Sequence, residues 1–170
     1  MRVLGIDPGT AVMGYGVVEA GSSRHPVLVE CGTLTAPARA PLPVRLRVLY
    51  EGVSELLSRH TPEALAVESA FYGRNVRTAV VLSHARGVIL LAGELAGVNL
   101  AEYSPASVKK AIVGRGAALK PQVGYMVAQL LRLTVPPSPE DAADAVAVAL
   151  THLTIATRRA VFAQHGASRL

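Results

Sequence analysis

A short apolar strand that ends in an aspartate is the feature that most constrains this chain. Residues 3–7 read Val-Leu-Gly-Ile-Asp, so Asp7 closes a strand that is apolar up to its last residue. A proline and a glycine follow at once and predict a tight turn, while Gly14 and Gly16 let the returning chain pass close to the carboxylate. The pattern predicts an antiparallel hairpin with an acid at the end of its buried strand. A hairpin in which Asp7 hydrogen-bonds only its own turn is the plainer alternative.

Strand and helix patterns follow one another along the rest of the chain. Apolar runs bounded by turn residues predict strands, and apolar residues three or four apart predict helices. The predicted strands span 3–7, 14–18, 27–34, 65–68 and 98–103, and the predicted helices span 42–57, 76–97, 105–113, 121–131 and 138–158. A helix before the last strand makes that strand parallel to its neighbour. We expect an α/β fold: one domain over 1–158, a mixed five-stranded sheet with helices on both faces, and a frayed tail over 159–170.

Composition narrows the class of protein. Hydrophobic residues make up 51% of the chain, yet no apolar run approaches the roughly 20 residues of a membrane span, so we expect a soluble protein without a membrane partner. The single cysteine, Cys31, excludes an internal disulfide and fits a reducing cytoplasm. A net charge of +5 is compatible with an anionic partner.

The lysines are few and close together. The 17 basic residues include only Lys109, Lys110 and Lys120, and all others are arginine. A compact, flexible ammonium suits a position beside a phosphate, which makes Lys109, Lys110 and Lys120 candidate phosphate contacts. A solvated helix face is the alternative explanation.

Aspartate is equally scarce, and its placement points to a metal site. The only three are Asp7, Asp141 and Asp144, and the last two lie three residues apart on one face of the final predicted helix. Asp141 could simply stabilise the start of that helix, by interacting with the helix dipole and by completing a capping box with Ser138. Asp144, however, lies among alanines and valines, where an unpaired buried carboxylate costs several kcal/mol. Glu68 ends the strand 65–68 as Asp7 ends the first strand.

If both strand ends open at one edge of the sheet and the last helix crosses it, these four acids converge. No basic residue lies close to them in sequence, so a metal is the expected counter-ion. Oxygen ligands without cysteine or a histidine pair favour Mg²⁺ or Mn²⁺. Two such ions would activate a water and stabilise the departing oxygen of a phosphodiester. His84 and His152 are more readily explained as hydrogen-bonded residues of apolar helices than as catalysts.

The segment after Glu68 combines aromatic and basic side chains. Phe71 and Tyr72 are adjacent, and Arg74 and Arg77 follow them. Such a loop can stack on unpaired bases while its guanidinium groups meet phosphates. For Tyr72, a ring that caps the core is the alternative.

The predicted helix 76–97 is apolar on almost every side. A helix on the surface of a sheet needs only one apolar stripe, so a second face requires cover. A second copy of the chain across a two-fold axis is the simplest cover, and burial at the centre of one domain is the alternative.

Taken together, these motifs resemble the RuvC family of Holliday junction resolvases. The resemblance runs in order from Val3 to about His152. It is carried by Gly5–Thr10 with Gly14–Val17, by Val67-Glu68 with Phe71, by Ala85–Val88, by Asp141–Ala145, and by Ala149–His152. The chain departs from the family pattern at Ala11, Ser69 and Tyr72, positions that bear on DNA affinity rather than on the reaction class.

The resemblance implies a ribonuclease H-like fold, a homodimer, and Mg²⁺-dependent paired incisions in strands of like polarity at a four-way DNA junction. It implies that the four acids bind the metal, that Phe71 stacks on a base, and that Lys109 and Lys120 contact DNA near the cleaved phosphate. It also implies partnership with the branch-migration proteins RuvA and RuvB.

Three other functions fit parts of the pattern. The turn after the first strand also resembles the phosphate loop of the actin, sugar-kinase and Hsp70 ATPases, although 170 residues leave no room for their second domain. A non-catalytic junction-binding protein would not need four acids. A related nuclease acting on another branched substrate or on RNA is the nearest alternative.

Overall fold

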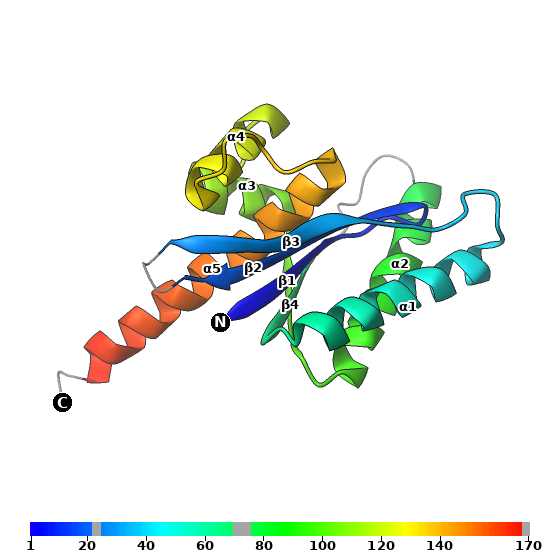
Figure 1. Cartoon of the computed structure of the whole chain (residues 1–170), viewed down its shortest axis with the longest axis horizontal. Coiled ribbons are helices and arrows are strands. Elements are labelled where there is room, and N and C mark those ends of the chain that lie inside the picture. Colours follow the sequence, from blue (N-terminus) through cyan, green and yellow to red (C-terminus); the bar gives the residue numbers. More distant parts are fainter. Residues whose placement is uncertain (22–24, 70–75, 168–170) are drawn as a thin grey trace.

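A computed structural model describes residues 1–21, 25–69 and 76–167 of the chain. Five strands form one sheet in the order β3-β2-β1-β4-β5, with helices packed on it (Figure 1). The strands are β1 (Arg2–Asp7), β2 (Val12–Ala20), β3 (Pro26–Thr35), β4 (Ala64–Glu68) and β5 (Asn99–Tyr103). The helices are α1 (Leu42–His60), α2 (Val76–Leu95), α3 (Pro105–Val113), α4 (Lys120–Leu131) and α5 (Glu140–Ala167).

The sheet is mixed, as the sequence predicts. β1 pairs antiparallel with β2 and parallel with β4, and β4 pairs parallel with β5. Ile6 of β1 lies opposite Val67 of β4, so the next residue of each strand, Asp7 and Glu68, ends at the same edge of the sheet. This register brings together two acids that are far apart in the sequence.

Helices cover both faces of the sheet, which confirms the predicted layering. α1 and α2 lie on one face, and α3, α4 and α5 lie on the other (Figure 1). The α1 and α2 face is filled with large aliphatic side chains such as Leu4, Ile6, Leu49 and Ile89. The opposite face uses many alanines and valines from α5.

Glycines bring α5 unusually close to the first hairpin. A Cβ atom at Gly5 would lie 2.2 Å from the carbonyl oxygen of Ala145, and one at Gly14 would lie 1.9 Å from that of Asp141. Real Cβ atoms do not approach backbone so closely, so any larger residue would push α5 away from the sheet. The start of α5 is thereby held over the end of β1.

The outer helix α2 keeps an apolar surface. It buries Ala85, Ile89 and Ala92, as a helix packed on one side does. Three large side chains of the same helix are 51%, 53% and 66% exposed: Val80, Leu91 and Leu95. The predicted second apolar face therefore exists and is not covered by the described part of this chain.

By length and composition alone, the segment Thr78–Leu95 would be long and apolar enough to cross a membrane, which differs from the expectation that no segment approaches this length. It is the one such helix in the described segments, and apolar core helices meet the same test.

The boundaries of α2 agree with prediction to within two residues, whereas α5 continues past the predicted end at Arg158 to Ala167. The residues beyond Arg158 include alanine, arginine and glutamine, which are good helix formers.

Candidate active site

Two strand ends and the first turns of α5 form the candidate site. Asp7 and Glu68 line a cavity of about 160 Å³ at the edge where β1 and β4 end. The cavity is completed by Pro8, Ser69, Leu82, Arg86 and Pro105. Asp141 and Asp144 come from α5, whose close packing on Gly14 sets them beside the end of β1.

The charges show that the four acids are close enough to interact. Burial raises the pKa of Asp7 to about 7, and the negative charges of Glu68, Asp144 and Asp141 contribute to that increase. Burial also raises the pKa of Glu68 to about 7, with a further contribution from Asp144. Several carboxylates that oppose one another's ionisation need a cation to remain charged together. Asp7 therefore lies near enough to each of the other three acids for their charges to affect it.

Lys120 supplies part of the positive charge, which corrects the sequence argument. Its Nζ donates a hydrogen bond to Oδ2 of Asp144 at 2.9 Å and lies 2.8 Å from Oε1 of Glu140. These contacts with Glu140 and Asp144 raise the pKa of Lys120 well above its usual range. The acids lack a basic neighbour along the sequence but not in the fold, because Lys120, the first residue of α4, reaches Asp144 and Glu140 at the start of α5.

The acids fit a hard divalent cation by chemistry and charge. Carboxylate oxygens are the ligands that Mg²⁺ and Mn²⁺ prefer, and a bound cation would offset the burial and neighbouring negative charge that raise the pKa values of Asp7 and Glu68. As placed, no three Asp, Glu, His or Cys side chains among the described residues stand close enough to enclose an ion. Ion binding would require these side chains to move closer together.

Comparison with known proteins identifies the family. The family model described as crossover junction endodeoxyribonuclease RuvC matches residues 3–152. This chain belongs to the RuvC family. A crossover junction endodeoxyribonuclease of Alkalilimnicola ehrlichii is 51% identical over 98% of this chain and 99% of its own. That of Halorhodospira halophila is 52% identical over 89% of each chain. The chain is thus a nuclease of the hydrolase class, which sets the nucleotide-binding alternative aside.

Solved RuvC structures have the same fold. The Thermus thermophilus RuvC structure has a TM-score of 0.85 and 38% identity, covering 93% of this chain and 96% of that one. T. thermophilus RuvC in complex with a Holliday junction substrate gives a TM-score of 0.84 and 35% identity, with the same coverage. A yeast mitochondrial Holliday junction resolvase shares the fold alone, with a TM-score of 0.67 and 12% identity. The expected ribonuclease H-like resolvase fold is confirmed.

Some of the predicted DNA contacts lie in the described part of the structure, and others lie outside it. Lys109, on α3, lies close enough to Glu68 for its charge to lower the pKa of that carboxyl group, whereas Lys110 is exposed. The loop contacts are not tested, because Phe71, Tyr72 and Arg74 lie outside the described residues, as does the side chain of Arg77.

Two features of the site were missed by reading the sequence. Arg86, on α2, lines the cavity and donates from Nε and Nη2 to the two carboxylate oxygens of Glu102 on β5. Glu140 shares Lys120 with Asp144. Both are contacts between separate elements, and local spacing carries no signal for them.

The two histidines have structural partners: Nδ1 of His84 lies 2.8 Å from the carbonyl oxygen of Val80, and Nδ1 of His152 lies 2.9 Å from the hydroxyl of Tyr103.

Proposed function

We propose that this chain is a structure-selective endonuclease that resolves four-way Holliday junctions. It makes paired, symmetric cuts in strands of like polarity during recombination and DNA repair. The single observation that carries the proposal is the cluster of four acids at the ends of β1 and β4 and the start of α5, in a chain of the RuvC family. The match to RuvC solved with a Holliday junction supports the choice of substrate.

Asp7, Glu68, Asp141 and Asp144 would hold the metal, and each is a catalytic acid in this proposal. The cofactor is Mg²⁺, with two ions per site, and Mn²⁺ can substitute. Bound ions would supply an activated water and charge stabilisation for the departing oxygen. The preference for hard cations follows from an all-carboxylate donor set.

Lys120 has two roles in this proposal. In the free chain, its ammonium lies 2.9 Å from Oδ2 of Asp144 and offsets part of the negative charge there. When DNA arrives, the long, flexible stem lets the ammonium turn from Asp144 towards a phosphate near the cleaved bond. Lys109, beside Glu68, and Lys110 would contact neighbouring phosphates. Phe71 would stack on an unpaired base, and Tyr72, Arg74 and Arg77 would contact the same strand.

The active form would be a homodimer built on α2. The exposed side chains of Val80, Leu91 and Leu95 support this, because an apolar surface on a helix is stabilised by a self-complementary partner. Two copies related by a two-fold axis would present one site to each of two strands. Family membership also supports cooperation with RuvA and RuvB and work in the cytoplasm.

The test is cleavage of a synthetic four-way junction, labelled at one strand end at a time, beside a linear duplex of the same sequence. Each substrate is incubated with Mg²⁺, with Mn²⁺ and with chelator. We expect ligatable nicks at symmetric positions of the junction only, and only with metal. Binding without cutting under every metal would contradict the proposal and favour a non-catalytic protein. Cutting of other branched DNA or of RNA in preference would favour the alternative nuclease.

A further inference from the structure

Arg45, in the first turn of α1, contacts the turn that follows the catalytic strand. Its Nη1 donates to Oγ1 of Thr10 at 3.2 Å and to the carbonyl oxygen of Thr10 at 3.4 Å. Thr10 is three residues after Asp7, so the two Cα atoms are at most about 11 Å apart. Arg45 therefore lies at the edge of the sheet that carries the acids, on the α1 side.

The guanidinium of Arg45 lacks an anionic partner within the described chain. Its Nε is buried and makes no hydrogen bond. Three arginines of the described segments are half-buried, and the other two are paired with acids: Arg2 with Glu19 and Arg86 with Glu102. Partly burying a charge without a counter-charge is costly, and two contacts to the neutral groups of Thr10 do not replace one.

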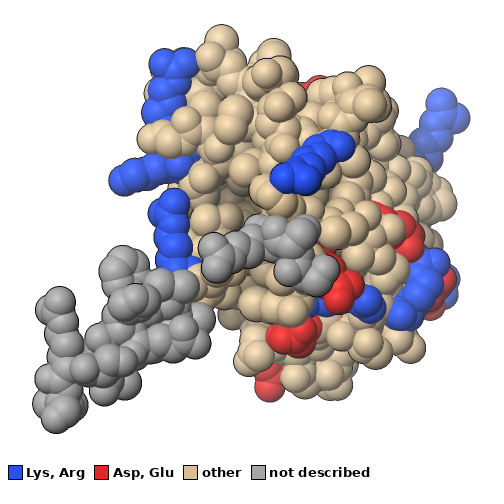
Figure 2. Space-filling model, turned by 60° about the vertical axis from the view of Figure 1, so that its left-hand side comes forward, with Lys and Arg blue, Asp and Glu red and all other residues tan. Residues whose placement is uncertain are grey.

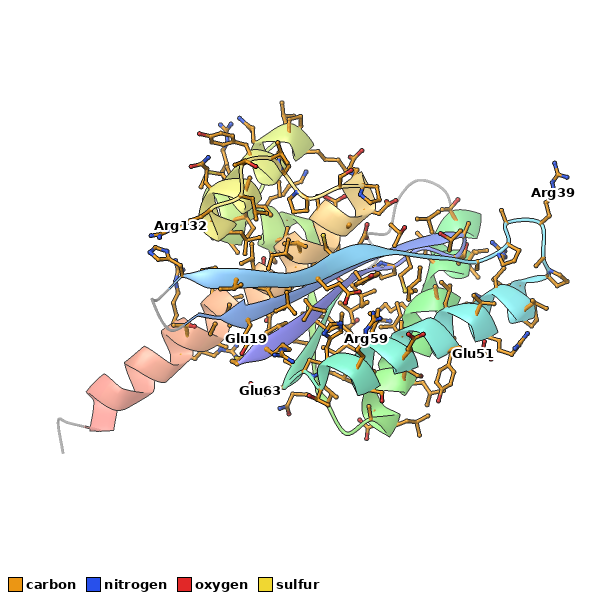
Figure 3. The ribbon with its side chains drawn as sticks, in the orientation of Figure 1. Glu19, Arg39, Glu51, Arg59, Glu63 and Arg132 are labelled. Carbon is orange, nitrogen blue, oxygen red and sulfur yellow. The ribbon has the colours of Figure 1, made fainter. Side chains whose placement is uncertain are left out.

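The surroundings of Arg45 add positive rather than negative charge. The first turn of α1, all of which is described, contains no acid. Arg39, in the loop before α1, points outward at this same end of the helix (Figure 3), and it has no carboxylate within ion-pair distance among the described residues. Arg47, two residues on, is by contrast paired with Glu51 at 2.9 Å.

Elsewhere, Lys and Arg side chains lie on the surface. On the face shown in Figure 2, several of them follow the left edge, and most of the Asp and Glu side chains lie on the lower right part. An unpaired, partly desolvated guanidinium beside the site is a more specific place for a phosphate than isolated surface charges.

We infer that Arg45 binds a backbone phosphate of the junction strand on the α1 side of the site. This inference rests on the proposed function. Each DNA strand carries one charge per roughly 3.4 Å of helix axis, so a span of about 11 Å places that phosphate within about three nucleotides of the cleaved bond. Nη1 stays on Thr10, and Nη2 donates to the phosphate. Arg45 is a DNA-binding residue in this scheme, and Thr10 holds it in place.

The test compares Arg45→Met, which keeps much of the stem and removes the charge, with Arg45→Lys, which keeps the charge. Arg47→Met is the matched control on the same helix, because Arg47 is exposed and already paired with Glu51. Junction affinity is measured without divalent ions over a range of salt concentrations, and thermal unfolding is measured for each variant. We expect Arg45→Met to bind about 10-fold more weakly, with a salt slope smaller by about 0.9 for each phosphate that the variant no longer neutralises. Arg45→Lys should keep the wild-type slope, and Arg47→Met should match wild type.

A second arm locates the contact. Junctions are made with one neutral methylphosphonate each, at successive positions near the cleavage point. Each substitution at a contacted phosphate should lower the junction affinity of wild type. At one of these positions, the substitution should leave the affinity of Arg45→Met unchanged. An unchanged slope for Arg45→Met with a lowered unfolding midpoint would overturn the inference and make Arg45 a structural support for Thr10. Failure of the wild type to bind the junction would refute the proposed function instead, so the two failures are distinguishable.

Discussion

The two faces of the sheet are packed by different rules. On the α5 face, small residues such as Gly5, Gly14, Ala145 and Ala149 let backbone approach backbone, so the position of the helix is fixed closely. On the α1 and α2 face, large aliphatic side chains fill the space, and the outer helix leaves apolar side chains in solvent. The comparison teaches that one face positions chemical groups, while the other leaves apolar side chains of its outer helix in solvent.

The two faces also differ in the charged side chains that they carry. The α5 face gathers four acids whose proximity and burial raise the pKa values of two of them to about 7. Burial and mutual repulsion of these carboxylates are unfavourable for the folded state when no cation is bound. The α2 face pairs its one cavity-lining charge, Arg86, with Glu102.

The largest expected effect is on the chemistry of the α5 face. Asp144→Asn should lower the rate of junction cleavage by about 10³-fold, because it removes a charge that is needed only at the reacting phosphate. Junction affinity should remain within a few-fold of wild type, since affinity depends mainly on phosphate contacts. Single-turnover cleavage and binding without metal measure the two quantities. Glu51→Gln, an exposed acid of α1, is the control, and equal cleavage by both variants would refute the assignment of Asp144.

The next largest expected effect is a loss of folding stability when the close packing of α5 on the sheet is disrupted. Gly5→Ala should lower the free energy of unfolding by about 3 kcal/mol, because its Cβ would lie 2.2 Å from the carbonyl oxygen of Ala145. Gly124→Ala, inside α4, meets nothing closer than Pro136 at 3.8 Å and should stabilise by up to about 1 kcal/mol. Urea denaturation compares the two. A Gly5→Ala protein as stable as wild type would show that α5 is not held by this contact.

The charge on the α5 face predicts a pH dependence of stability in the absence of metal. The pKa values of Asp7 and Glu68 are raised in the folded state, to about 7, so the folded protein binds protons more tightly than the unfolded chain between about pH 4 and 7. Stability therefore falls as pH rises through this range. We expect a loss on the order of 5 kcal/mol between pH 5 and pH 8, because each of the two carboxyl groups contributes about 1.4 kcal/mol per pH unit up to its pKa.

Asp7→Asn isolates this effect, since it removes one of the raised groups. Thermal unfolding at pH 5 and pH 8 with chelator should show a smaller decrease for Asp7→Asn than for wild type. Adding Mg²⁺ at pH 8 should raise the wild-type midpoint more than that of the variant. Identical pH profiles for the two proteins would mean that burial and neighbouring charges do not raise the pKa of the Asp7 carboxyl group.

The smallest expected effect belongs to the α2 face. Leu91→Ser should raise the dimer dissociation constant by at least about 10-fold, since it removes apolar area from the proposed interface. It should change the stability of the monomer by less than about 0.5 kcal/mol, because Leu91 is 53% exposed. Val135→Ser, at a position outside α2 that is 66% exposed, is the control. Sedimentation that shows the same assembly state for all three proteins would place the interface elsewhere.

Much of the α5 face could be predicted from sequence, because its signals are local. Strand 3–7 ends in an acid, glycines mark the hairpin, and the spacing of Asp141 and Asp144 sets both on one side of a helix. Parallel pairing then requires Asp7 and Glu68 to meet at one edge. Each step depends on periodicity or chain order, which a sequence displays directly.

Contacts between separate elements could not be predicted in this way. The bonds from Lys120 to Asp144 and from Arg86 to Glu102 join segments whose relative placement depends on the whole packing of the domain. The same holds for Arg45 and Thr10, where the informative feature is a missing partner. The exposed face of α2 is intermediate: its composition predicts an apolar surface but not which side chains remain in solvent.

Mixed dimers test the central claim most directly, since that claim assigns one set of four acids and one incision to each copy. Wild type and Asp144→Asn, carrying different affinity tags, are mixed, and the dimers that hold one copy of each are isolated. These are given a junction carried in a supercoiled plasmid, with Mg²⁺. The account predicts plasmids nicked once, at one of the two symmetric positions. Linear plasmids cut at both positions by the mixed dimer would contradict it, because one set of acids would then serve both strands.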